Sequence, residues 1–413
     1  MKSRCQYILA GWLIDGSGEP IREKVLLKIE DGLFSGIGNY NSSDTPDPAL
    51  LTDFSHTVIL PALLDSHVHL CMSGTVDPAA REKQLKVECG ELLPVITEHI
   101  TQQFSHGVVA LRDAGDRHRC VLRYRREEIG RGREPVMVMS AGRAFYQKGR
   151  YGGLIGGHPV DGERLAEAFN RDEQPGDQVK IINSGLNSLS VFARETSCQF
   201  SLQELQELVV QAKKQAKKVM VHANGSLPVQ RALEAGCDSI EHGFFMGPEN
   251  LERMAESRTF WVPTIYTMKA CAEYAGNCSV VADRGVIEKN LAQQIEQLSQ
   301  ARACGVRVAL GTDAGSIGVL HGEALVEELK LFIQAGYPLV EAIRCATENN
   351  ARLLGLESEF GRIAVGKPAH FLVARGTPAQ LPRKLSYLEA LYLDGSPSEF
   401  YRKFRRDQPD HKT

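Results

Sequence analysis

The sequence predicts an α/β fold: a (β/α)8 TIM barrel with a small β-sandwich domain formed from both chain termini. Short apolar runs alternate with amphipathic helical patterns over roughly 250 residues, the extent of such a barrel. The runs also suit an open doubly wound sheet, but no Gly-x-Gly-x-x-Gly follows any of them. The eight predicted barrel strands are residues 63–69, 108–113, 135–141, 178–183, 218–222, 238–242, 259–264 and 306–311.

The two ends of the chain carry strand patterns of a different kind. Apolar runs flank Asp31-Gly32, a typical hairpin turn. Two more short apolar runs surround a Gly-Lys-Pro turn at residues 366–368. We therefore predict one small β-sandwich domain from residues 1–60 and 355–413, with the barrel, residues 61–354, inserted between them.

Helix signals separate the barrel strands. Ser201 and Glu204 form a Ser-x-x-Glu capping box at the start of a predicted helix over residues 201–215. Further helical patterns at residues 229–235 and 286–304 are each followed directly by glycine, which commonly ends a helix.

The composition excludes several classes of partner. With a net charge of −3, the chain has no excess of basic residues for binding nucleic acid. No run approaches the length of about 18 apolar residues that a membrane span needs. Ten cysteines without a Cys-x-x-Cys pair predict reduced thiols and a cytoplasmic location. We expect a small-molecule or dipeptide substrate, and the sequence leaves open whether the chain forms a homo-oligomer.

The run over residues 60–70 ends in His67 and His69. On a strand, residues two apart project from the same face, and Asp65 lies behind them. Two imidazoles on one rigid face make half of a metal site. An isolated pair of this kind is better interpreted as one core histidine and one exposed histidine. The rest of the chain, however, supplies further ligands.

These further ligands also lie at strand ends. His222 ends the fifth predicted strand, His242 ends the sixth, and Asp313 follows the eighth. In a barrel, the carboxyl ends of the strands converge on the active site. Four histidines and an aspartate that converge there predict a site for one or two divalent cations, with zinc first.

Lys180 is unusual because it lies inside the fourth predicted strand, where burial of a bare ammonium group is costly. If its amine carries CO2 as a carbamate, the side chain becomes an anion that can bridge two metals. The alternative is that Lys180 extends to the barrel rim and pairs with a carboxylate. From this residue alone, the alternative is favoured.

Taken in order along the chain, these residues resemble the amidohydrolase superfamily, in its binuclear subtype with a carboxylated lysine. The phrases around Asp113, His158, His242 and Asp313 are similar to those of prolidase-like dipeptidases and carboxypeptidases and of imidazolonepropionase-like proteins. The resemblance covers nearly the whole chain. The residues that carry it are His67, His69, Lys180, His222, His242 and Asp313.

The resemblance implies two divalent ions, expected to be zinc, and a CO2-derived carbamate on Lys180. One ion would bind to His67, His69 and Asp313, and the other to His222 and His242, with carboxylated Lys180 shared between them. A hydroxide between the ions would be the nucleophile.

Two residues would assist the reaction if the resemblance holds. Asp313 would take the proton of the nucleophile and pass it to the leaving amine. His158 would polarise the scissile carbonyl.

A long glycine-rich segment, residues 143–162, is predicted to cover the substrate. Arg143, Arg150, Tyr151 and His158 are candidates to bind a substrate carboxylate, for which arginine has suitable paired donors. For Arg150, a cation that merely faces water is an equal alternative. Asn224 stands where relatives often carry a second histidine, so the orientation of the substrate is open.

The sequence therefore predicts a metal-dependent hydrolase of amide bonds. We expect a prolidase-like dipeptidase or carboxypeptidase, or a hydrolase of N-acyl amino acids. The alternative enzyme is an imidazolonepropionase-like hydrolase of cyclic amides with a mononuclear site, against which the bridging lysine argues. The alternative of another class is a catalytically silent scaffold. A scaffold predicts lost ligands, whereas every candidate ligand position carries a competent residue.

Overall fold

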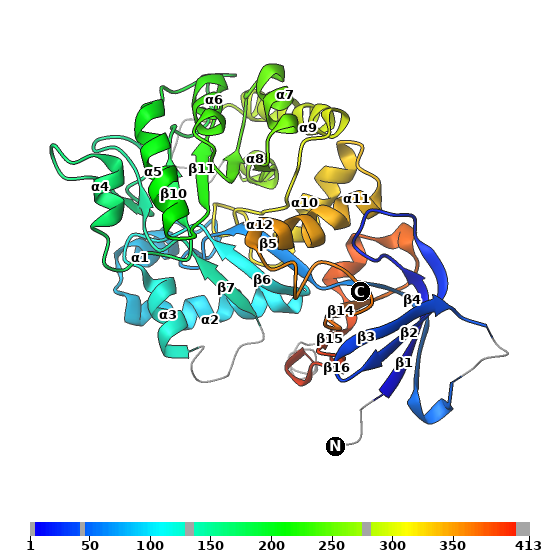
Figure 1. Cartoon of the computed structure of the whole chain (residues 1–413). Coiled ribbons are helices and arrows are strands. Elements are labelled where there is room, and N and C mark those ends of the chain that lie inside the picture. The colour runs from blue at the N-terminus through cyan, green and yellow to red at the C-terminus, as the bar shows by residue number, and fades with distance from the viewer. Residues whose placement is uncertain (1–4, 42–45, 129–135, 275–281, 402–413) are drawn as a thin grey trace. The chain divides into compact units, whose positions relative to one another are not determined.

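The computed structural model describes residues 5–41, 46–128, 136–274 and 282–401 (Figure 1). It is an α/β protein with one seven-stranded sheet and two sheets of parallel strand pairs. The chain divides into two compact units. One contains residues 1–64, 102–109 and 338–413, and the other contains residues 65–101 and 110–337.

Both ends of the chain contribute to the seven-stranded sheet, in the order β16-β15-β14-β4-β1-β2-β3. The predicted hairpin at Asp31-Gly32 is confirmed, because these residues turn the chain between antiparallel β2 and β3 with left-handed backbone. The predicted strand before the Gly-Lys-Pro turn is wrong, since only the run after it forms a strand. The strands are β1 (Cys5–Leu13), β2 (Arg22–Glu30), β3 (Leu33–Asn39), β4 (Leu51–Pro61), β14 (Phe371–Arg375), β15 (Leu388–Leu393) and β16 (Ser396–Pro397).

The two other sheets have the orders β13-β12-β11-β10-β8-β9 and β5-β6-β7. They confirm strands at the first seven predicted positions, to within two residues at each end, apart from Pro135, which lies outside the described residues. Two short strands inside the predicted lid, β8 and β9, had no signal in the sequence. The strands are β5 (Leu63–Val68), β6 (Val108–Asp113), β7 (Met137–Ser140), β8 (Ala144–Phe145), β9 (Gly156–Gly157), β10 (Val179–Ile182), β11 (Val219–Ala223), β12 (Ser239–His242) and β13 (Phe260–Val262).

The eighth predicted strand, residues 306–311, is wrong as a continuous strand. Val308 forms an isolated parallel bridge with Trp261, in which Trp261 N donates to Arg307 O and Ala309 N donates to Trp261 O, both at 2.9 Å. On the other side, Ser66 N donates to Leu310 O at 3.0 Å. The segment therefore bonds to β13 at one point and to β5 at another, and it carries Asp313 close to His67.

Helices follow most of these strands along the chain (Figure 1). The predicted capping box is confirmed: Ser201 Oγ accepts a hydrogen bond from Glu204 N at the start of α5. Helix α9 ends as predicted, at Gly305 with left-handed backbone. The helices are α1 (Pro78–Lys86), α2 (Cys89–Ser105), α3 (Cys120–Glu128), α4 (Leu165–Asn170), α5 (Leu202–Lys214), α6 (Ser226–Glu234), α7 (Pro248–Glu256), α8 (Tyr266–Glu273), α9 (Arg284–Cys304), α10 (Glu323–Gln334), α11 (Leu339–Arg344) and α12 (Asn350–Leu354).

Within the described ranges, no helix is both long enough and apolar enough to cross a bilayer. The prediction that all thiols are reduced is wrong at one place, because a disulfide joins Cys89 to Cys120. These residues begin α2 and α3, and they lie 31 positions apart in the sequence. Their proximity depends on how the two helices pack, which cysteine spacing alone does not reveal.

Candidate metal centre

The structure brings together all six residues that were predicted as metal ligands. They line one cavity of about 480 Å³. His222 on β11 lies level with Ile182 on β10, and His242 on β12 lies level with Ala223 on β11. Because these strands run parallel, their carboxyl ends present their side chains to the same space.

The first group of donors consists of His67, His69 and Asp313. Their ligand atoms all lie within 4.8 Å of one another. Asp313 Oδ1 is 3.5 Å from His67 Nε2 and 3.3 Å from His69 Nε2. His67 Nε2 is buried and has no hydrogen-bond partner among the described residues, which is unusual for a buried imidazole nitrogen. A divalent cation would supply the missing partner, so this donor set fits a metal.

The second group consists of His222 and His242, whose ring centroids lie 4.6 Å apart. His222 Nε2 bonds Gly185 O at 3.1 Å, and His242 Nδ1 bonds Thr264 Oγ1 at 2.7 Å. In each ring, one nitrogen is thus engaged and the other is left to act as a ligand. Burial, reinforced for His222 by Lys180, lowers the pKa of both imidazoles, to about 3 for His222. Both rings are therefore neutral, as metal binding requires.

Lys180 lies inside the cavity and only 1 % of it is exposed. The predicted alternative, in which this lysine extends to an exposed rim, is therefore wrong. Burial lowers the pKa of the amine to about 8, although the carboxylates of Glu241 and Asp313 raise it. A larger fraction of the amine is consequently neutral near pH 7 than in an ordinary lysine.

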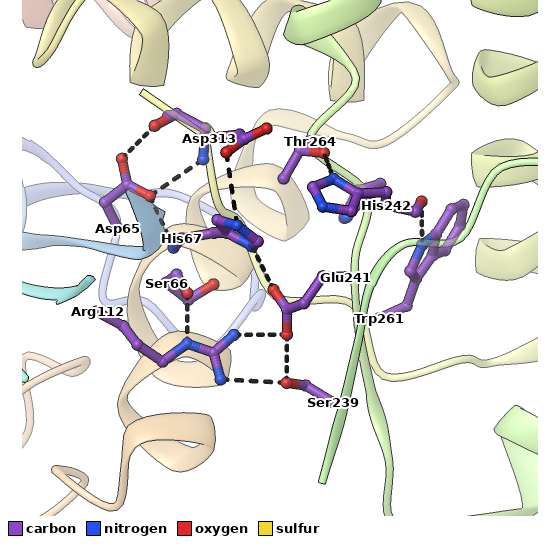
Figure 2. Close-up of polar contacts among 12 residues, drawn as sticks. Asp65, Ser66, His67, Arg112, Ser239, Glu241, His242, Trp261, Thr264 and Asp313 are labelled. Carbon is purple, nitrogen blue, oxygen red and sulfur yellow. Dashed lines mark hydrogen bonds and ion pairs between the residues drawn. The ribbon is translucent and has the colours of Figure 1, made fainter. Parts of the chain in front are cut away.

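A buried ion-pair network holds His67 in place (Figure 2). Glu241 Oε2 accepts a hydrogen bond from His67 Nδ1 at 2.5 Å, and Glu241 Oε1 accepts one from Arg112 Nη2 at 2.9 Å. Arg112 also donates to Ser66 O and Ser239 Oγ. Burial alone would raise the pKa of the Glu241 carboxyl, but Arg112 and His67 lower it. The ionised Glu241 thus fixes the His67 tautomer and directs Nε2 into the cavity.

Asp313 is held by contacts between β5 and the segment that follows residue 311. Asp65 accepts hydrogen bonds from Thr312 N at 3.1 Å and Thr312 Oγ1 at 2.6 Å. Asp313 N donates to His67 O at 2.7 Å. Burial opposes ionisation of the Asp313 carboxyl, but the imidazoles of His69 and His67 lower its pKa well below the usual range. Asp313 is therefore a carboxylate at neutral pH.

His242 and Asp313 share an uncommon backbone conformation. Their φ angles are 66° and 57°, in the left-handed region that non-glycine residues rarely occupy. The His242 carbonyl accepts a hydrogen bond from Trp261 Nε1 at 2.9 Å (Figure 2). It also accepts one from Gln294 Nε2 at 2.7 Å, and both bonds stabilise that conformation. Such strain persists where the surroundings over-determine the geometry, as they do around functional groups.

Only some of the residues predicted to contact substrate lie in the cavity. Tyr151 and Asn224 line the cavity, and the Tyr151 ring lies 5.5 Å from the His222 ring. Arg143 and His158 instead line neighbouring pockets, where His158 Nδ1 bonds Pro159 O at 2.9 Å. Arg150 is exposed, and its guanidinium donates to Ser197. For these last three residues, roles in catalysis or substrate binding stay predictions.

The sequence reasoning missed Arg112, Glu241 and Thr264. Arg112 and Glu241 are charged residues inside apolar strands, and both are fully buried. A charged residue inside an apolar strand was also what drew attention to Lys180, so the sequence could have identified Arg112 and Glu241 in the same way. Thr264 had no comparable signal, because a threonine after a strand is common.

Replacing Thr264 by valine is expected to lower the metal affinity of the cavity roughly tenfold, because His242 Nδ1 loses its hydrogen-bond acceptor. Titration against a chromogenic chelator measures this affinity. Thr97→Val, an exposed change on α2, is the matched control and should leave the affinity unchanged. Equal affinity in both variants would show that Thr264 does not orient the imidazole.

The fold and the donor set indicate a class of protein: α/β enzymes with donor residues for a metal ion at the carboxyl ends of parallel strands. The chain belongs to the Amidohydrolase family, whose model matches residues 58–401. It is accordingly a hydrolase of amide bonds.

Individual relatives agree with this assignment. The chain is 25% identical to ochratoxinase of Aspergillus niger over 414 aligned residues. The alignment covers 92% of this chain and 83% of that protein. The structure is similar to that of a Xaa-Pro dipeptidase with bound methionine, with a TM-score of 0.78 and 28% identity over 95% of this chain and 99% of the other. The A. niger ochratoxinase structure shares the fold, with a TM-score of 0.76 and 20% identity over 96% of both chains.

Proposed function

We propose that the protein is a binuclear metallohydrolase that cleaves the amide bond of small dipeptides or N-acyl amino acids. The observation that carries the proposal is the convergence of His67, His69, Lys180, His222, His242 and Asp313 on one cavity. The similarity to a Xaa-Pro dipeptidase and to ochratoxinase supports an amide substrate of this size.

The proposal includes a closed (β/α)8 barrel over residues 61–354 and a β-sandwich from residues 1–60 and 355–413. Closure of the barrel is supported on one side by Trp261 N, which donates to Arg307 O at 2.9 Å. On the other side it is supported by the parallel bridge between Val68 and Ala314. These contacts link the ends of the two parallel sheets through the segment that precedes α10.

In this proposal, His67, His69 and Asp313 would hold one divalent ion, and His222 and His242 would hold the other. Zinc is the first candidate, since imidazole and carboxylate ligands suit it. The neutral Lys180 amine would attack CO2, so that an N–C bond forms, one C=O π bond breaks onto oxygen and one N–H proton passes to solvent, and a carbamate replaces a cation. Burial of Lys180 and its lowered pKa of about 8 favour the neutral amine that this step requires.

When bound, the ions would lower the pKa of a water molecule and polarise the scissile carbonyl. Asp313 moves the proton. Its Oδ1 faces His67 and His69, whereas its Oδ2 accepts a hydrogen bond from Ser316 Oγ at 3.0 Å. Oδ2 is therefore the oxygen that accepts the proton of the attacking water and returns it to the leaving amine nitrogen.

The cavity walls favour an apolar group on the substrate. Beyond the ligand cluster, part of the lining is aliphatic or aromatic and part is polar or charged, and a cavity of about 480 Å³ is within the usual range for a small molecule. Apolar side chains in such a wall bind apolar substituents by excluding water. The wall residues are Leu92, Ile155, Leu186, Leu189, Phe244 and Met268.

A panel of dipeptides and N-acyl amino acids, incubated with the zinc-loaded protein, tests this function. We expect turnover of members with an apolar acyl group or side chain, loss of turnover after chelation, and recovery on adding zinc. Turnover of cyclic amides alone would replace the proposal with the cyclic-amide alternative. Absence of turnover by fully metal-loaded protein would favour the silent scaffold.

A further inference from the structure

A second pocket, of about 380 Å³, lies beside the catalytic cavity. Arg117 and His118 line both of them, so the two spaces share a wall. Among the described residues, no carboxylate lines this second pocket, although it contains two arginines and two histidines. We call it the cationic pocket. Its lining residues are Arg117, His118, Arg143, Tyr146, Gly156, Gly157 and His158.

We propose that the cationic pocket binds an anionic group, a phosphate or a carboxylate, between the guanidinium groups of Arg117 and Arg143. Neither arginine has an ion-pair partner within the described part of the chain. Two arginines nearby differ in this respect. Arg119 pairs with Asp172 at 2.6 Å, and Arg171 pairs with Glu163 at 2.6 Å.

The wall of the cationic pocket is held by strand pairing and by close packing of Arg143. Gly157 on β9 pairs with Phe145 on β8, and Tyr146 N donates to Gly157 O at 3.1 Å. A Cβ atom at Gly157 would lie 2.7 Å from Arg143 Nε. The glycine therefore lets the Arg143 side chain lie directly against the strand, which restricts its position.

The chemistry of this wall fits an oxyanion. A guanidinium group presents planar paired donors that match carboxylate and phosphate oxygens. Arg143 is half-buried, and burial together with the charges of Arg119, Arg171 and Arg117 lowers its pKa, although the Asp172 carboxylate raises it. An anion in the pocket would relieve this repulsion, and partial burial strengthens the attraction.

The anionic group has two possible sources. It is either an acidic arm of the amide substrate, reaching past Arg117 from the catalytic cavity, or a free small anion. Only the first source rests on the proposed function. Both kinds of anion would be bound by the same guanidinium groups. The experiment therefore has two arms: the first measures whether the pocket binds an anion, and the second determines whether that anion belongs to the substrate.

The first arm is a calorimetric titration of the zinc-loaded protein with inorganic phosphate. We expect Arg143→Gln to weaken phosphate binding at least about tenfold, because it removes a charged donor pair. Lys148→Gln is the matched control, since Lys148 is exposed, belongs to the same segment and pairs with Asp161 at 2.9 Å outside the pocket. It should leave the affinity unchanged.

Phosphate that binds only at the metal centre would bind equally well to wild type and to Arg143→Gln, and this result would overturn the proposal. Arg117→Gln, an exposed change, replaces Arg143→Gln if the latter does not fold. The same loss of phosphate affinity is then expected, and unchanged affinity is again contradictory.

The second arm compares kcat/KM for an N-acyl glutamate and the matching N-acyl glutamine. A preference for the acid that Arg143→Gln abolishes would assign the pocket to the substrate. An unchanged ratio, with weakened phosphate binding, would assign it to a free anion. If no amide is hydrolysed at all, the proposed function fails, whereas the phosphate titration still decides the cationic pocket.

Discussion

The variant Lys180→Ala is expected to lose most of the bound metal and to reduce kcat/KM about a thousandfold, since metal ions contribute several kcal/mol to catalysis. Lys180 is the proposed anionic bridge, and it lies within the cavity with both histidine groups and Asp313. If the proposed centre is correct, removing Lys180 would take away the shared anionic ligand that offsets the charges of the two ions. Metal content per chain and the rate of amide hydrolysis, measured on the same preparation, check this result.

The control for this variant is Lys214→Ala, an exposed lysine at the end of α5. It should keep both metal and activity. Short-chain carboxylic acids should partly restore activity to Lys180→Ala, because a carboxylate can occupy the space of the lost carbamate. Full metal content and full activity in Lys180→Ala would show that the lysine does not bridge the metals.

Replacing Glu241 by glutamine is expected to destabilise the protein by roughly 3–5 kcal/mol, the usual cost of an uncompensated buried charge. The charge that loses its partner is Arg112, which is fully buried like Glu241. His67 Nδ1 also loses a charged acceptor, so the metal affinity should fall about 10- to 100-fold. Denaturant unfolding of the metal-free protein and a zinc titration measure the two effects separately.

Glu234→Gln is a suitable comparison, because Glu234 pairs with Arg253 at 3.4 Å on the surface. Surface pairs of this kind contribute about 0–1 kcal/mol, so little change is expected. If Glu241→Gln resembled Glu234→Gln in both stability and zinc affinity, the buried network would have no part in holding His67.

The strands that carry the ligands could be predicted from the sequence because their apolar runs are short, buried and separated by clear helix signals. The segment over residues 306–311 differs, because it does not pair continuously with either neighbour. Val308 forms one isolated bridge with Trp261, and Leu310 O accepts a hydrogen bond from Ser66 N. A sequence pattern reports which residues are apolar, but not how long the neighbouring strand is. The short strands β8 and β9 escaped prediction for a related reason, since a glycine pair carries no strand signal.

The candidate ligands were predictable because each histidine or carboxylate lies at or just beyond the end of an apolar strand run, and parallel strands end together. The direction of side chains in the glycine-rich segment was not predictable. Arg143 and His158 were expected to face the substrate, yet they line pockets beside the catalytic cavity. The partnership of Arg112 with Glu241 joins two strands far apart in sequence. Sequence alone identifies such charges as unusual without pairing them.

The number of divalent ions bound per chain, for protein grown with zinc and bicarbonate, tests the central claim most directly. The account predicts about two ions per chain, with amide hydrolysis lost as they are removed and regained as they return. About one ion per chain would contradict the binuclear centre and favour the mononuclear alternative. Protein that binds no metal would contradict the account as a whole.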